Sequence, residues 1–375
     1  MKAKAAVFMG EKKPFEIREF EITKPPKGYA QMKLIASGIC GTDIHMHNGK
    51  LAVAAPSIIG HEFIGRISDA DPEEAASFGL KIGDNVIADI AVPCGECLLC
   101  KSGDDANCVN MKVTNGGSID EAPYLYGGYT EVNYTPLANL IRIPDSIDPA
   151  VAAIFACPGP TAMHAFHLAR LAGVDFTKIR SAVVQGLGPV GCFAVMYLHA
   201  IGIESVYAIT AGNNEEREAL AKKLGAKEVL NLTAMGTEAF TQRLQKENGG
   251  LGVDLCFEAS GAPSAVVQGM DILRNRGVYL VPGQYSNSGG VVIQPQMITF
   301  KALHIIGSSQ YSMLDVNAYL TFLDEHKQLH DCISKLGTRY HIEEVNQAFA
   351  DSISADIYTE DAASAADAAA AVFEG

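Results

Sequence analysis

The sequence predicts an α/β protein with a β-rich first part and a doubly wound parallel sheet in its middle region. Up to about residue 157, short runs of β-branched and aromatic residues alternate with turns that contain glycine, proline or aspartate, which is typical of an all-β region. From Pro158 the pattern changes to alternating helices and strands, which indicates parallel strands joined by helices. The 375 residues are enough for two domains of ordinary size.

The expected elements follow from these patterns in chain order. Strands of the first part are expected at 4–8, 29–36, 61–68 and 85–91. In the middle region we expect helices at 161–171, 190–199 and 214–224, and strands at 180–185, 205–210, 253–257 and 277–281. A further helix is expected at 314–326. The alanine-rich tail after residue 354 could form a terminal helix or fray, and no final strand is recognisable in it.

Composition and charge exclude several classes of protein. The chain is 48% hydrophobic and 19% charged, which is a globular composition. Its net charge of -14 leaves no basic surplus to neutralise phosphates, so we expect neither a nucleic-acid nor a membrane partner. No apolar run is long enough to span a bilayer, and the first residues lack a signal sequence, so we expect a cytoplasmic protein. The nine cysteines are odd in number and clustered, which favours metal-binding thiolates over disulfides.

Four of these cysteines form one compact motif with the spacing C-x2-C-x2-C-x7-C. They are Cys94, Cys97, Cys100 and Cys108. Four thiolates suit tetrahedral zinc, and such a closed shell leaves no position for a substrate. The motif therefore predicts a structural zinc site.

A second group of metal-ligand residues is more dispersed. Cys40, His61 and Glu62 are close in sequence, and Cys157 lies far downstream, where the β-rich part ends. Taken singly, each cysteine could be an ordinary buried apolar residue and the histidine an ordinary hydrogen-bonded one. Taken together, two thiolates and a neutral imidazole would balance the charge of a zinc ion and leave a position open for an alcohol oxygen.

A glycine-rich turn follows the expected strand at 180–185 and precedes the expected helix at 190–199. It consists of Gly186, Leu187, Gly188, Pro189, Val190 and Gly191. In this context, G-x-G-x-x-G predicts a dinucleotide-binding turn of the Rossmann type, with the pyrophosphate at the N-terminus of the helix.

The choice of cofactor stays open between NAD and NADP. An NAD enzyme usually has an acidic residue at the end of the second strand, where it binds the ribose 2′-hydroxyl. Here that place falls on Thr210, followed by residues without a carboxylate up to Glu215. A 2′-phosphate would not be repelled there, but Arg217 is the nearest arginine and acidic residues flank it. The pattern leans slightly to NADP.

In combination, these residues resemble the zinc-dependent alcohol dehydrogenases of the medium-chain dehydrogenase/reductase superfamily. The resemblance extends to about residue 350. It is carried by Cys40-Gly-Thr-Asp-x-His45, Gly60-His-Glu62, Lys81-x-Gly-Asp-x-Val86, the four-cysteine motif, Gly127-Gly-Tyr-x-Glu131, Cys157 with Thr161, and the glycine-rich turn.

The resemblance implies a GroES-like catalytic domain over 1–157, completed by 305–375, and an inserted Rossmann-type domain over 158–304. It also implies two zinc ions per chain. Cys40, His61 and Cys157 would bind the catalytic zinc, with Glu62 beside them as an occasional ligand, while the four-cysteine motif would bind the structural zinc. A homodimer or homotetramer is expected on the same grounds.

Further roles implied by the resemblance concern the helix that follows Cys40. Thr42 would take the proton of the alcohol and pass it, through the cofactor ribose, to His45 and solvent. Asp43 would orient His61, although a plain turn-forming or capping role is the alternative.

The resemblance therefore implies a zinc-dependent oxidoreductase. It would transfer a hydride between a nicotinamide and a primary or secondary alcohol, possibly a polyfunctional one, and the aldehyde or ketone would be the other reactant. Two alternatives use the same scaffold: a lyase or epimerase that retains its cofactor, and a non-catalytic zinc-binding relative.

Overall fold

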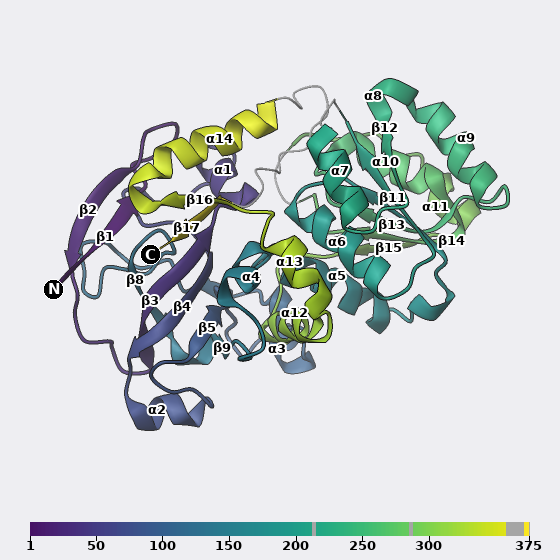
Figure 1. The fold of residues 1–375 in the computed structure, drawn as a ribbon. Coiled ribbons are helices and arrows are strands. Elements are labelled where there is room, and N and C mark those ends of the chain that lie inside the picture. Colours follow the sequence, from purple (N-terminus) through teal and green to yellow (C-terminus); the bar gives the residue numbers. More distant parts are fainter. Residues whose placement is uncertain (212–214, 285–287, 358–370, 375) are drawn as a thin grey trace. The chain divides into compact units, whose positions relative to one another are not determined.

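The computed structural model describes residues 1–211, 215–284, 288–357 and 371–374. The chain divides into two compact units (Figure 1). The first contains Met1–Pro160, Gln310–Ile353 and the last described strand, whereas the second contains Thr161–Ser309. Among the described helices, none is long and apolar enough to cross a membrane.

The first unit is built on a seven-stranded sheet. Its order is β16-β17-β3-β4-β5-β9, and β8 also pairs with β3. The strands are β3 (Tyr29–Gly38), β4 (Glu62–Asp69), β5 (Asn85–Ala88), β8 (Val132–Pro136), β9 (Leu140–Arg142), β16 (Thr338–His341) and β17 (Ala371–Glu374). Alternate residues of β3, such as Met32 and Leu34, are buried and pack with Phe63 of β4. Side chains of a strand point alternately to its two faces, so these residues form one layer of the core.

Two short strand pairs and several short helices complete this unit. The pairs are β1 (Lys2–Val7) with β2 (Glu16–Glu21), and β6 (Ala91–Val92) with β7 (Lys112–Val113). The helices are α1 (Gly41–His47), α2 (Pro72–Ser77), α3 (Leu98–Ser102), α4 (Pro149–Ile154), α12 (Met313–Glu325), α13 (His330–Ile333) and α14 (Val345–Ile357). Its 3-10 turns are η1 (Asp105–Asn107), η2 (Leu137–Asn139), η4 (Lys327–Leu329) and η5 (Ile342–Glu344).

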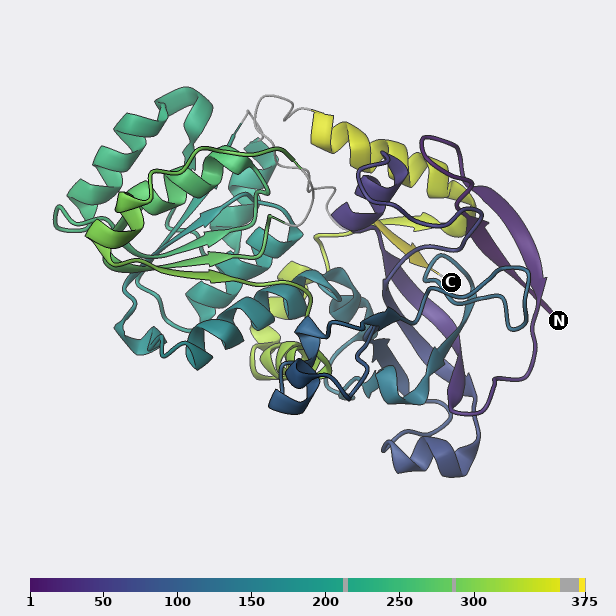
Figure 2. The same ribbon diagram turned by 180° about the vertical axis from the view of Figure 1, so that it is seen from behind.

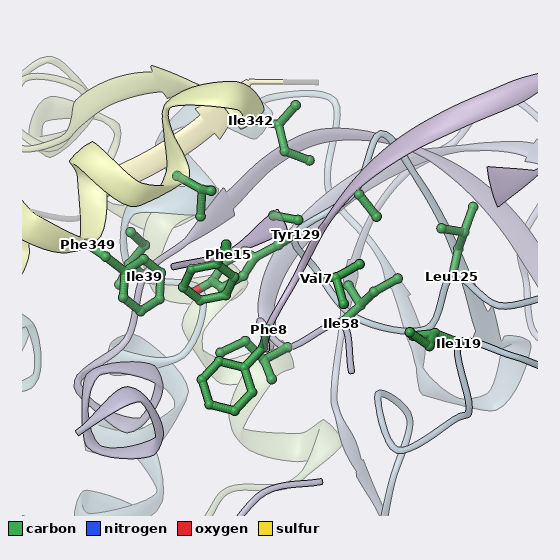
Figure 3. Close-up of a cluster of buried hydrophobic side chains, with 14 of the residues drawn as sticks. Val7, Phe8, Phe15, Ile39, Ile58, Ile119, Leu125, Tyr129, Ile342 and Phe349 are labelled. Carbon is green, nitrogen blue, oxygen red and sulfur yellow. The ribbon is translucent and has the colours of Figure 1, made fainter. Parts of the chain in front are cut away.

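A second core of this unit joins the beginning of the chain to α14 (Figure 3). Phe8 and Phe15 come from the N-terminal segment, and Phe349 comes from α14. The ring centroids of Phe15 and Phe349 are 4.6 Å apart, and both rings contact Tyr129 edge-on. Residues more than 300 positions apart in sequence are therefore held together by aromatic packing.

The second unit contains a six-stranded parallel sheet in the order β12-β11-β10-β13-β14-β15. Its strands are β10 (Ser181–Gln185), β11 (Ser205–Thr210), β12 (Glu228–Asn231), β13 (Val253–Glu258), β14 (Leu273–Val281) and β15 (His304–Gly307). Every residue of β10 is buried, as expected for a central parallel strand covered on both faces.

Helices cover both faces of this sheet (Figures 1 and 2). They are α5 (Pro158–Leu171), which begins in the first unit, α6 (Pro189–Ala200), α7 (Glu215–Lys223), α8 (Leu232–Met235), α9 (Thr237–Glu247), α10 (Pro263–Ile272) and α11 (Gln296–Lys301), with the 3-10 turn η3 (Phe176–Lys178). The strand order reverses beside β10, which is the arrangement of a doubly wound fold. The predicted α/β fold class is confirmed.

The end of the chain differs from the sequence-based expectation. No final strand was recognisable in the tail, but the structure places β17 between β16 and β3, parallel to the former and antiparallel to the latter. Local sequence did not identify this strand because pairing with β3, more than 300 residues away, determines it. The helix suggested for the tail extends only as far as the end of α14 within the described residues, and 358–370 lie outside them.

Candidate metal centre and cofactor turn

The first unit brings together Cys40, His61, Glu62 and Cys157. Each offers one ligand atom, and these atoms all lie within 4.8 Å of one another. Cys40 precedes α1, His61 and Glu62 lie at the start of β4, and Cys157 lies between α4 and α5. Three separate segments of the chain therefore supply the two sulfurs and the imidazole that the sequence grouped by residue type.

The position of Cys40 follows from the way α1 begins. The backbone N–H of Cys40 donates to Asp43 Oδ2 at 2.9 Å, and the Cys40 carbonyl accepts the first helical hydrogen bond from the Asp43 amide. This reciprocal cap fixes Cys40 at the helix N-terminus. Its sulfur lies 3.7 Å from Thr42 Oγ1.

His61 is oriented by the same carboxylate. Its Nδ1 lies 3.4 Å from Asp43 Oδ1, and both side chains are buried. Burial opposes a charge on His61, but Asp43 and Cys40 outweigh it and raise the pKa of the imidazole. Because Nδ1 is turned to Asp43, Nε2 is the nitrogen left to bind a metal. Asp43 thus both caps α1 and faces His61, and its orienting role stays a prediction.

The donor set suits a zinc ion. Two sulfurs and one imidazole are the ligand types of an open zinc site. The pKa of Cys40 is lowered by its hydrogen bond with Cys157, despite burial, and also by His61. Burial and the neighbouring Cys40 raise the pKa of Glu62, and its Oε1 is buried without a hydrogen-bond partner among the described residues. An unpartnered buried carboxyl oxygen in this cluster is what a cation would satisfy.

The four remaining predicted ligands form their own cluster. The Sγ atoms of Cys94, Cys97, Cys100 and Cys108 lie within 4.8 Å of one another. Backbone amides point at them: Cys94 N donates to Cys108 Sγ at 3.2 Å and Cys97 N to Cys94 Sγ at 3.4 Å. Such N–H donors stabilise thiolates, so this loop also suits a zinc ion.

The two predicted relay residues share α1 with Asp43. Thr42 is in its first turn, beside Cys40, and His45 follows one turn later. Burial, with a smaller contribution from the charge of Lys50, lowers the pKa of His45. The lowered pKa favours the neutral imidazole, which is the form that can accept a proton.

The glycine-rich turn of the second unit has the geometry that its sequence predicts. Gly186 follows β10 with φ of +88°, where a side chain is strained, and Gly188 caps α6 with Pro189 in the first turn. Thr210 ends β11, the neighbouring strand. The free amides at the start of α6 are therefore presented beside the carboxyl ends of β10 and β11, where a dinucleotide binds in such sheets.

A loop after β13 lies at the same edge of the parallel sheet as the glycine-rich turn, and the sequence alone did not identify it. A β-carbon on Gly186 would lie 2.8 Å from Ser260 Cα, so this loop packs directly on the turn. It is held by Glu258, which is buried and accepts hydrogen bonds from the backbone amides of Ser260 and Gly261 at 2.7 and 2.9 Å. The signal available in sequence was a carboxylate at the end of a buried apolar strand.

The sequence alone also assigned no role at the metal cluster to two tyrosines, Tyr311 and Tyr129. Tyr311 is buried, and its hydroxyl has no hydrogen-bond partner among the described residues. Burial first, and then the charges of Cys157 and Asp89, raise its pKa. Tyr129 is fully buried, and burial first, and then the charge of Asp43, raise its pKa. Tyrosine is not a usual zinc ligand. Tyr129 belongs to the Gly127-Gly-Tyr-x-Glu131 motif that carried the resemblance, but the motif gave it no role at the metal cluster, and Tyr311 was not selected at all.

Comparison with known proteins identifies the family. Residues 26–145 match the model of the alcohol dehydrogenase GroES-like domain, and residues 189–325 match that of zinc-binding dehydrogenases. The chain is 31% identical to 5-exo-hydroxycamphor dehydrogenase of Pseudomonas putida, over 82% of this chain and 83% of that protein. The chain belongs to the zinc-dependent alcohol dehydrogenase family.

Other relatives agree with this assignment. The dehydrogenase is 30% identical to L-threonine 3-dehydrogenase of Pyrococcus furiosus, over 78% of each chain. Its fold matches the crystal structure of an alcohol dehydrogenase from Thermotoga maritima with a TM-score of 0.87, 28% identity and coverage of 100% and 99% of the two chains. The predicted family is confirmed, and the protein is an oxidoreductase that acts on alcohols with a nicotinamide cofactor.

Proposed function

We propose that this dehydrogenase interconverts a secondary alcohol and its ketone at the cluster of Cys40, His61 and Cys157. The convergence of these residues from three segments is the observation that carries the proposal. The two relatives named above act, by their names, on hydroxycamphor and on C3 of threonine, and both of these carbinols are secondary. A hydride would pass between the carbinol carbon and C4 of the nicotinamide.

Each residue of the cluster and of α1 would then have a separate role in the reaction. When bound, zinc polarises the alcohol oxygen and lowers its pKa. The hydroxyl of Thr42, beside Cys40, takes the proton of the alcohol. His45, whose lowered pKa favours the neutral imidazole, passes the proton on to solvent. Asp43 keeps the imidazole of His61 in one orientation. Glu62 stands beside these ligands as an additional carboxyl donor.

A second zinc ion is proposed for the four-cysteine loop, where it would stabilise the loop and take no part in the reaction. Four thiolates close the coordination shell, and their combined charge reduces the Lewis acidity of the ion. We also propose a cytoplasmic location, because a reducing compartment keeps such thiolates available for a metal.

For the cofactor we propose NADP, with NAD as the rival. Thr210 ends β11, and the sequence has no carboxylate from there until Glu215. A 2′-phosphate would therefore meet no acidic side chain at the strand end, whereas the ribose 2′-hydroxyl of NAD would lack its usual acceptor. Three glutamates in the first turn of α7 work against this choice.

A homo-oligomer is proposed from the edge of the second unit. In the described part of the chain, β15 pairs on one side only, with β14. Ile305 of β15 is 42% exposed, and the segment that precedes this strand in sequence also exposes Val292 (88%) and Phe300 (77%). An uncovered edge strand of this composition can pair with its copy in a second chain. Sedimentation should give a dimer or tetramer, and Ile305→Arg should shift it toward the monomer.

A panel of alcohols and polyols, run in parallel with NAD and NADP, tests the proposed reaction. We expect net formation of reduced nicotinamide, seen by its near-ultraviolet absorbance, with secondary alcohols favoured over primary ones. Product formation without net cofactor reduction would indicate the cofactor-retaining lyase or epimerase. If zinc-loaded protein converted no alcohol, the non-catalytic alternative would replace the proposal.

A further inference from the structure

Two loops follow the neighbouring strands β13 and β14 at the carboxyl edge of the parallel sheet (Figure 1). On its other side, β13 pairs with β10, the strand that leads into the glycine-rich turn. The strand order reverses between β10 and β13, because the chain runs outward from β10 through β11 to β12 and then returns to β13. Dinucleotides bind across the carboxyl edge at such a reversal, with one mononucleotide half on each side.

The glycine-rich turn and Thr210 lie on one side of this reversal. The turn follows β10 and Thr210 ends β11, so the adenosine half of a dinucleotide would lie on the β10–β11 side. The nicotinamide half would then extend over the ends of β13 and β14. Residues that fix the loops after these two strands therefore shape the nicotinamide side of the site.

The carboxylate of Glu258, the last residue of β13, holds the first of these loops. Its Oε1 accepts hydrogen bonds from the Ser260 amide at 2.7 Å, from the Ser260 hydroxyl at 2.6 Å and from the Gly261 amide at 2.9 Å. The Ser260 hydroxyl accepts in turn the Ala262 amide at 3.2 Å. Three successive residues of the loop are therefore fixed, directly or through the serine, by one carboxylate oxygen.

The other oxygen of Glu258 holds the second loop. Its Oε2 accepts a hydrogen bond from Gln284 Nε2 at 3.1 Å, and the same side-chain amide donates to the Ala262 carbonyl at 3.1 Å. The Gly283 amide donates to the Glu258 carbonyl at 3.0 Å. A β-carbon on Gly283 would lie 2.6 Å from Glu258 Oε2 and 2.9 Å from Ala259 Cα, so the two loops approach too closely for a side chain there.

The burial of Glu258 shows that these hydrogen bonds matter energetically. Its side chain is fully buried at the end of an apolar strand. Burial raises the pKa of the carboxyl, and the hydrogen bonds from Ser260, Gln284 and Gly261 oppose this rise. A carboxylate in such surroundings costs free energy unless donors satisfy both of its oxygens, and here the two loops supply those donors.

The first loop also packs against the glycine-rich turn, but this turn has supports of its own. A β-carbon on Gly186 would lie 2.8 Å from Ser260 Cα. The Gly186 amide donates to the Ile209 carbonyl at 3.1 Å, and Gly191 packs on the Gly186 carbonyl. Loss of the Glu258 hydrogen bonds should therefore loosen the two loops more than the turn.

We propose that Glu258 is a positioning residue of the cofactor site: its carboxylate joins the loops after β13 and β14 into one surface that orients the nicotinamide half of the cofactor. The inference rests on the nicotinamide cofactor identified above and not on the choice between NAD and NADP, because both carry the same nicotinamide half. Its consequence is selective: the carboxylate should affect binding of the whole dinucleotide and not that of its adenosine half.

The test is Glu258→Gln, which keeps the size of the side chain but places an amide donor against the donors of the loops. Asp254→Asn is the matched control, because Asp254 lies near the other end of β13 and its carboxylate also accepts backbone amides, those of Arg180 and Ser181, at 2.8 and 3.0 Å. Calorimetric titration measures the affinity for NADPH and NADH. It also measures the affinity for adenosine 2′,5′-bisphosphate and for adenosine 5′-monophosphate, which represent the adenosine halves. None of these readouts requires turnover.

We expect Glu258→Gln to weaken dinucleotide binding by about 10-fold or more and to change binding of the adenosine fragments by less than about twofold. Asp254→Asn should bind all four ligands as the wild type does, even though it loses stability. Gln284→Met removes only the link to the second loop, and it should weaken dinucleotide binding by about threefold. In a Glu258→Gln background, Gln284→Met should add less than about twofold, because the link is already broken.

Three outcomes would count against the inference. Wild-type affinity for the dinucleotides in Glu258→Gln would overturn it. An equal loss of dinucleotide and fragment binding would also overturn it, because Glu258 would then support the whole edge of the sheet. If the wild type bound neither NADPH nor NADH, the cofactor site itself would be wrong, and the role of Glu258 with it. Should Glu258→Gln not fold, Gln284→Met decides by the same comparison, because Gln284 is exposed and its replacement leaves the core intact.

Discussion

Gly191 lies so close to the carbonyl oxygen of Gly186 that a β-carbon on Gly191 would overlap this oxygen. The contact joins the first turn of α6 to the end of β10, so it sets the shape of the dinucleotide turn. Gly191→Ala must displace that backbone. We expect the unfolding free energy to fall by about 1–3 kcal/mol and nicotinamide binding to weaken.

Thermal unfolding and cofactor titration check this prediction. Gly290→Ala is the control, because a β-carbon at Gly290 meets no atom within 4 Å. If both alanine variants unfold and bind the cofactor alike, the close approach at Gly186 has no energetic consequence.

The two cysteine clusters should respond differently to substitution. Cys157→Ala removes one ligand from the proposed catalytic zinc, so turnover should fall below detection while the fold persists, with one zinc ion fewer in metal analysis. Cys97→Ala opens the four-cysteine shell, so it should first lower the unfolding temperature. The opposite pattern would mean that the catalytic and structural assignments are exchanged.

Thr210→Asp tests the proposed preference for NADP. Thr210 is the last residue of β11, and a carboxylate there would repel a 2′-phosphate and accept a hydrogen bond from a ribose 2′-hydroxyl. We expect kcat/KM to fall with NADP and to hold or rise with NAD. Thr210→Asn, which is similar in size and uncharged, separates charge from shape. A preference that stays the same in both variants would place the 2′ group elsewhere.

Asp254 should make the stability of the second unit depend on pH. Burial alone would raise its pKa, but Arg274 and the amides of Arg180 and Ser181 lower it below the ordinary value of 3.8. A carboxylate with a lowered native pKa stabilises the fold above its unfolded pKa, and this contribution is lost as the pH falls through the native pKa.

Asp254→Asn should therefore lower the unfolding free energy by about 1–3 kcal/mol at pH 7. The difference from the wild type should shrink as the pH falls below about 4. Urea unfolding across this pH range measures the change. Glu204→Gln, at an exposed carboxylate of the same unit, should have little effect at any pH. A difference that is constant with pH would exclude the charge of Asp254 as its cause.

Much of the architecture was predictable because its signals are local. The apolar strand at 180–185, the glycine turn and the following helix form a contiguous pattern, and the structure has them as β10 and α6. The ligand group of Cys40, His61 and Cys157 was predicted by residue type, and the structure brings its atoms within 4.8 Å. Their binding of zinc stays a prediction that the experiments above address.

The parts that could not be predicted depend on residues far apart in the chain. The strand β17 forms by pairing with β3. The position of the loop at Ser260 depends on its packing against Gly186. Tyr311 and Tyr129 reach the metal cluster only because separate segments fold around it. No local pattern marks Tyr311, and the motif around Tyr129 does not show which residues Tyr129 contacts, since those partners are known only once the chain is folded.

By itself, the sequence determined the chemistry: thiolates and an imidazole for zinc, and glycines where a pyrophosphate approaches a helix N-terminus. These features are recognised from side-chain type and from the spacing of residues along the chain, and both can be read without the fold. Tertiary structure alone decided which polar groups lie behind the ligands, above all the approach of Asp43 to His61. The physical reason is that a buried hydroxyl or carboxylate must find its partner in three dimensions, wherever the chain supplies one.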